Sequence, residues 1–144
     1  MSSIRETIVA WLFEKLKDEL PDADVRRVRR RPVDKESPAS VSIELTGEQV
    51  TDNDLDGQVE TTAALRVVVA AMTDCGDTAI DDAVAAVHRA LLKDDSCGGH
   101  ADDGGLTYTG CSWDYEESGD GLAVTAEMAF EVTFTHSLSD MATA

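Results

Sequence analysis

The chain has 144 residues, and 29 acidic residues against 12 basic ones give it a formal charge of -17. A chain of this length forms one domain that buries about two thirds of its unfolded surface. The net acidity argues against nucleic-acid binding over the whole surface, and no run approaches the ~18 apolar residues of a membrane span, so no membrane partner is expected.

The charged residues are unevenly divided among the residue types. Asp outnumbers Glu by 18 to 11, and only four residues are lysine. Hydrated carboxylates with few lysines resemble the surface of a protein from a very salty cytoplasm, where a Debye length of about 3 Å screens self-repulsion. The alternative is a mesophilic acidic protein that must avoid nucleic acid.

Cysteine usage favours a reducing compartment. Cys75, Cys97 and Cys111 are odd in number and lack the spacing of a disulfide framework, so they are expected to be free thiols. The first twenty residues are charged throughout, which is unlike a signal peptide.

The first predicted element is an amphipathic helix. Ser3 to Glu6 has the form of a capping box, and Pro21 marks the end of the helix. Apolar residues follow at helical spacing between these signals: Ile4, Ile8, Trp11, Leu12 and Leu16.

A basic run follows the helix. Five of the twelve basic residues lie within six positions: Arg26, Arg27, Arg29, Arg30 and Arg31. Such a run could bind nucleic acid, but we interpret it as an edge strand or loop that meets the acidic surface of a neighbouring subunit. The alternative is a set of salt bridges to acidic residues within the same chain.

An acidic stretch, "TDNDLDG", then separates two strands expected at about 40–46 and 57–71. Asp52, Asp54, Asp56 and Gly57 match the first half of an EF-hand loop, but Ala63 stands where the closing bidentate Glu belongs. Both flanks alternate like strands, whereas an EF-hand needs helices. The stretch is therefore predicted to be a loop between strands, and calcium binding remains the weaker alternative to a solvated acidic loop.

The second half predicts a helix and a closing hairpin. Gly76, Asp77 and Thr78 break the preceding strand and offer caps for a helix whose apolar face is Ile80, Val84, Val87 and Leu91. A loop rich in Gly and Asp follows at 94–105. A turn at Glu116–Gly121 then joins two strands, and the second alternates strictly from 122 to 135.

The element order is thus α-β-β-β-α-β-β. It predicts an α+β two-layer fold, in which two main helices cover one face of a mainly antiparallel or mixed sheet of four to five strands. We expect one domain over residues 1–138 and a flexible tail at 139–144.

No motif predicts catalysis or a cofactor. Cys97-Gly-Gly-His100 offers one pair of zinc ligands without a second pair, and Cys111 is expected in the core. Nucleophile and phosphate-binding signatures are absent from the sequence. The chain is therefore predicted to be neither an enzyme nor a metal protein.

Two segments resemble the tail terminator proteins of long-tailed viruses, the lambda-type minor tail protein family. Ser37–Val69 is similar to that family's central hairpin, with a Pro38 entry and a strand that ends in Leu45-Thr46-Gly47-Glu48 before the acidic stretch. Gly110–Phe134 is similar to its closing hairpin, with Trp113-Asp114-Tyr115 and an acidic turn. The arginine run and the loop at 94–105 depart from the family pattern.

The resemblance implies a homohexameric ring without enzymatic activity, at the head-proximal end of the virion tail and assembled in the host cytoplasm. Its partners would be other copies of itself, the tail tube protein and a neck or head-completion protein. Viral DNA would pass through the bore without specific binding. The interface candidates are Arg26, Arg27, Arg29, Arg30, Arg31, Glu48, Asp52, Asp54 and Asp56. The alternatives are a neck or tail-completion protein and a calcium-dependent binding module.

Overall fold

The computed structural model describes residues 3–21, 23–27, 40–55, 57–73, 78–118 and 121–137. Two helices, α1 (Ile4–Glu19) and α2 (Thr78–Leu92), accompany five strands. The strands are β1 (Asp24–Arg27), β2 (Ser40–Leu55), β3 (Gln58–Thr73), β4 (Leu106–Ser118) and β5 (Gly121–Ser137). The predicted element order and the α+β class are confirmed.

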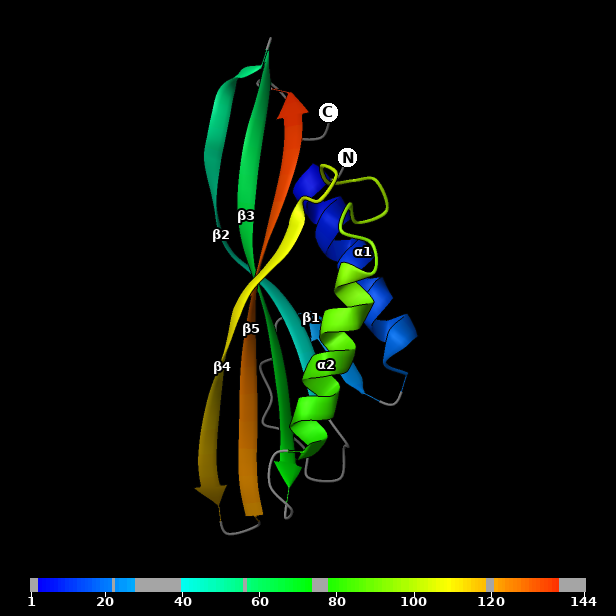
Figure 1. Cartoon of the computed structure of the whole chain (residues 1–144), viewed down its shortest axis with the longest axis vertical. Helices are drawn as coiled ribbons and strands as arrows, with labels where there is room; N and C mark the ends of the chain where they lie inside the picture. Colours follow the sequence, from blue (N-terminus) through cyan, green and yellow to red (C-terminus); the bar gives the residue numbers. More distant parts are fainter. Residues whose placement is uncertain are drawn as a thin grey trace.

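The strands form one mixed sheet in the order β1-β2-β3-β5-β4. β1 pairs with β2 in parallel, and the other neighbouring pairs are antiparallel. Two long hairpins, β2–β3 and β4–β5, are therefore joined through β3 and β5. The sheet twists strongly, and the far ends of the two hairpins point to opposite ends of the elongated molecule (Figure 1).

Both helices lie on one face of this sheet (Figure 1). α1 buries Ile8, Leu12 and Leu16, at the predicted helical spacing. Ser3 caps its N-terminus as predicted, because the backbone N–H of Glu6 donates to Ser3 Oγ at 3.1 Å, whereas the Glu6 carboxylate accepts from Arg27 and does not complete the capping box. No helix among the described residues is long and apolar enough to cross a membrane.

Strict alternation along β3 and β5 builds the core. Odd-numbered residues of β3 and even-numbered residues of β5 face the helices, and the strand register places them opposite one another. The members that are at most 3% exposed are Thr61, Ala63, Leu65, Val67, Val69, Ala71, Val124, Ala126, Met128, Phe130, Val132 and Phe134. The intervening residues form the opposite face, which no helix of the described structure covers.

The predicted strands are shorter than the observed ones. β2 continues through Leu55 and β3 begins at Gln58, so most of the acidic stretch is strand. Gly57 has a φ of 86°, a left-handed conformation that favours glycine. For residues 52–55 the prediction of a loop was wrong, because cross-strand pairing with β3 outweighs the low strand propensity of Asp.

Candidate functional site

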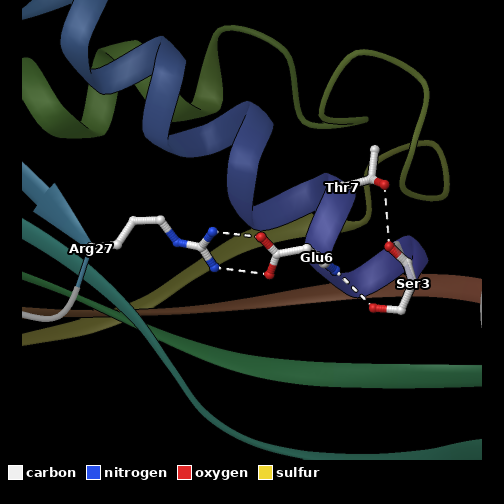
Figure 2. A network of polar contacts seen from close by, with 4 residues as sticks. All are labelled: Ser3, Glu6, Thr7 and Arg27. Carbon is white, nitrogen blue, oxygen red and sulfur yellow. Dashed lines mark hydrogen bonds and ion pairs between the residues drawn. The ribbon is translucent and has the colours of Figure 1, made fainter. Parts of the chain in front are cut away.

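The β1 edge of the sheet holds the described part of the arginine run. Arg27 Nη1 and Nη2 donate to the Glu6 carboxylate of α1 at 2.5 and 2.9 Å (Figure 2). Arg26 Nε lies 3.0 Å from Asp24 Oδ1. For these two residues the structure shows salt bridges within the chain, while Arg29, Arg30 and Arg31 lie outside the described residues.

The Glu6–Arg27 pair is bidentate and tethers the start of α1 to β1. The hydrogen bonds from Arg27 are the largest cause of a lowered pKa of the Glu6 carboxyl. A lowered carboxyl pKa stabilises the fold at neutral pH, and this contribution disappears as the pH falls through the lowered value. Both side chains are at least 40% exposed, so the pair contributes only about 0–1 kcal/mol.

The outer part of the β2–β3 hairpin carries the other candidates. Glu48 pairs with Arg5 of α1 at 2.6 Å, so this candidate also has a partner within the chain. Asp52 lies opposite Glu60 in the register of β2 with β3. Asp54 is in β2 as well, and Asp56 lies outside the described residues.

This arrangement does not favour the calcium interpretation. An EF-hand loop wraps an ion with twelve consecutive residues, whereas residues 52–55 and 58–63 belong to two antiparallel strands. Among the described residues no group of three or more His, Cys, Asp or Glu side chains is placed to hold a metal ion.

The Cys97-Gly-Gly-His100 motif is structural. Cys97 is fully buried, and burial is the main cause that raises the pKa of its thiol to about 12. A thiol that is protonated at neutral pH is a poor nucleophile. Gly98 has a φ of 69° and packs directly against the indole of Trp11, so this loop closes over α1.

The uncovered face of the sheet forms a broad groove that the sequence did not predict. It has a volume of about 610 Å³, and its lining includes the small residues Ala64, Ala129 and Gly110. Arg66, at its centre, forms ion pairs with Glu44 of β2 and Glu127 of β5, the latter at 3.5 Å. Three neighbouring strands are thus bridged by one guanidinium.

Replacing Arg66 tests this bridge. Arg66 is the only Lys or Arg in the described parts of β2 to β5, so Arg66→Met leaves Glu44 and Glu127 without this counter-charge. We expect a loss of about 1–2 kcal/mol in unfolding free energy at low salt, measured by urea denaturation, since the groups are only partly exposed.

The double variant Arg66→Met/Glu127→Gln is the control. It should recover part of the loss, because it also removes one of the unpaired charges. An Arg66→Met protein as stable as the wild type at low salt would show that the three side chains do not interact in solution.

The outer edge of the sheet at β4 carries the most prominent exposed aromatics. Trp113 and Tyr115 are 38% and 51% exposed, on the same face as the helices but beyond the area that the helices cover. Asp114, Glu116 and Glu117 alternate with or follow them and are also exposed. We call these five residues the aromatic-acidic edge.

Comparisons with known proteins give a fold relationship. No protein-family model and no curated protein matches the chain. Among solved structures, a chain from the virion of a native gene transfer agent particle superposes with a TM-score of 0.56 at 16% identity. The match covers 92% of this chain and 98% of that chain.

This chain shares its fold with that virion chain. A second structure is the sheath/tube terminator of an extracellular contractile injection system in its extended state, with a TM-score of 0.43 and 14% identity. That match covers 94% of this chain but 60% of the other.

Proposed function

We propose that this protein is a structural virion component that forms a homohexameric ring, ends the tail tube and joins it to the neck of the head. The observation that carries the proposal is the fold shared with a gene transfer agent virion chain over nearly the whole length of both chains. The tail terminator resemblance of the two hairpins supports the same role.

The form of the sheet suits assembly. It is open, with β1 at one edge and β4 at the other, and its two edges differ in length and charge. A contact between two unlike edges is heterologous, and heterologous contacts generate closed rings when the rotation between copies permits. The structure therefore provides two different surfaces that one ring contact needs.

The charge suits a channel for DNA. Six copies would carry a formal charge of 6 × -17 = -102. An acidic wall repels phosphate, so DNA would slide through the bore without binding. The same charge predicts that neutral or basic partners dock on the ring more readily than DNA does.

Mass photometry and negative-stain microscopy test the ring. The purified protein, alone and together with the tail tube protein of the same virus, is expected to form a hexamer that caps tube ends, at molar KCl if not at low salt. A protein that stays monomeric even with the tube would overturn the proposal.

The position of the protein within the particle distinguishes a tail terminator from a neck or tail-completion protein. Antibody labelling of intact particles should place the protein at the junction of tail and head. Labelling on the head side of that junction, with no contact to the tube, would favour a neck or tail-completion protein.

A further inference from the structure

Four large apolar side chains are exposed in the described structure, and they belong to two strands only. Leu45 and Val50 of β2 are 38% and 58% exposed, and the other two are Trp113 and Tyr115 of the aromatic-acidic edge on β4. β3 and β5 lie between these strands, and none of their described apolar side chains is exposed to this extent. The exposed apolar surface is thus divided between opposite sides of the sheet.

The strand register shows on which face these four side chains lie. Residues directly opposite each other on neighbouring strands point to the same face. Each of the four lies opposite a residue that is at most 3% exposed on the helix side: Leu45 opposite Leu65, Val50 opposite Thr61, Trp113 opposite Ala126, and Tyr115 opposite Val124. All four therefore share the helix side of the sheet, two near each edge.

The backbone at both edges is accessible to another strand. β1 pairs with β2 only from Ser40 to Ile43, so residues 44–55 have no neighbouring strand on their outer side within the described structure. β4 is the last strand at the other edge. Neither stretch contains Pro or Lys, two residues with which edge strands commonly resist pairing. Each edge thus presents a row of backbone groups to which a strand can add.

The directions of the two edge strands are compatible. β2 is antiparallel to β3, β3 to β5, and β5 to β4, so β2 and β4 run in opposite directions. When two copies lie side by side in the same orientation, β4 of one copy is therefore antiparallel to β2 of the next. Antiparallel pairs are the commoner kind in protein sheets.

The exposed pairs lie at different levels of the sheet. Trp113 is level with Val69 of β3, through Ala126 of β5, whereas Val50 is level with Thr61, nearer the start of β3. Successive copies that join these edges must therefore be offset along their strands. A sheet that closes on itself has such an offset, because closure requires strands that are inclined to the axis.

We propose that the β4 edge of one copy adds to the outer part of β2 in the next copy, so that Trp113 and Tyr115 pack against Leu45 and Val50. The proposal rests on the ring described under Proposed function and names its contact. A second copy is the partner because the chain itself carries both halves: two antiparallel edges, each with an apolar pair on the same face. Each copy gives one edge and receives the other, which is a heterologous contact of the kind that closes a ring.

The charge of the two edges determines how assembly depends on salt. Residues 44–55 and 106–118 hold acidic side chains and neither Lys nor Arg. The contact is therefore apolar and backbone-mediated, and it forms against electrostatic repulsion that molar KCl screens. We expect the wild-type concentration for half-assembly to fall about 10-fold between 100 mM and 2 M KCl, measured by mass photometry. Assembly that weakens as salt rises would contradict this contact.

Replacing the apolar pairs tests the contact from both sides. Trp113→Ser/Tyr115→Ser and Leu45→Ser/Val50→Ser are each expected to raise the concentration for half-assembly at least ~10-fold. Val68→Ser is the control, because it removes a half-buried apolar side chain from the uncovered face of the inner strand β3 and should assemble like the wild type. Circular dichroism melts show whether each variant is folded.

Cross-linking of two single-site proteins identifies which edges meet, without removing a whole apolar pair. In a background of Cys75→Ser and Cys111→Ser, Val50→Cys and Trp113→Cys each place one reactive thiol on one edge, while Cys97 stays buried. At molar KCl, a short bis-maleimide should give covalent dimers in a mixture of the two proteins and none in either protein alone. Contact between like edges would instead cross-link one protein by itself and would overturn the proposal.

The outcomes separate the contact from the ring itself. A wild-type ring whose folded variants assemble equally well, or whose mixture gives no cross-linked dimers, would overturn this contact and leave the proposed function standing. A wild-type protein that never assembles, with or without the tail tube, would overturn both. Weaker assembly of both apolar variants, together with cross-links in the mixture alone, supports the contact.

Discussion

Replacing Phe130 with alanine should lower the free energy of unfolding by about 3–5 kcal/mol. Phe130 is 1% exposed and lies in β5, opposite Leu65 of β3 and Tyr108 of β4. Its ring centroid is 5.3 Å from that of Tyr108. Truncation leaves a cavity where three strands meet beneath the helices, and a rigid sheet cannot collapse to fill it.

Trp113→Ala is the matched control for this prediction. It also removes an aromatic ring from the helix side of the sheet, but from a residue that is 38% exposed at the edge. Urea denaturation of the monomeric protein should show a much smaller loss than for Phe130→Ala. Equal losses would contradict the placement of Phe130 at the centre of the core.

The second large effect expected is that of salt. The formal charge of -17 makes the folded state repel itself at low ionic strength, and molar salt shortens the Debye length to about 3 Å. We expect the melting temperature to rise by about 10 °C between 20 mM and 2 M KCl, as a gain of a few kcal/mol implies for this size. Differential scanning calorimetry measures it directly.

A charge-reduced variant distinguishes screening from other effects of salt. Asp114, Glu116 and Glu131 lie on the uncovered face of the sheet, are exposed and take no part in the Arg66 bridge. Changing these three residues to Gln should raise the melting temperature at low salt and flatten its rise with KCl. A melting temperature that is flat or falling in the wild type would remove the interpretation of a protein adapted to high salt.

Local patterns predicted the elements of the fold well. The alternation from 122 to 135 predicted β5 and its buried face, and Ile8, Leu12 and Leu16 predicted the buried stripe of α1. These predictions hold because the burial of each residue depends mainly on the periodicity of the helix or strand to which it belongs. The closing turn was also predicted, although both strands extend further into it than expected. β4 continues to Ser118, and β5 begins at Gly121.

The surfaces were harder to predict, since they depend on register between strands. The Arg66 bridge needs Glu44 directly opposite Arg66 on β2, and the bulge between Leu45 and Gly47 shifts the register just beyond it. The exposure of Trp113 depends on where the helices stop covering the sheet. Neither fact can be read from the spacing of residues along the chain. Salt bridges of Arg26 and Arg27 within the chain, by contrast, are one of the interpretations that the sequence offered for the arginine run.

The pairing of β3 with β5 also has a consequence for how the chain folds. Each hairpin closes between neighbouring segments, but the central ladder joins Gln58 to Ser137 and Thr73 to Leu122, so it links residues that are far apart in the sequence. Closing such a long loop costs entropy before its contacts form, and this slows folding. We therefore expect the hairpins to form early and the junction between them to limit the rate. Until that junction closes, nascent copies expose the inner strands to one another, so a slow closure gives unfolded chains more time to associate.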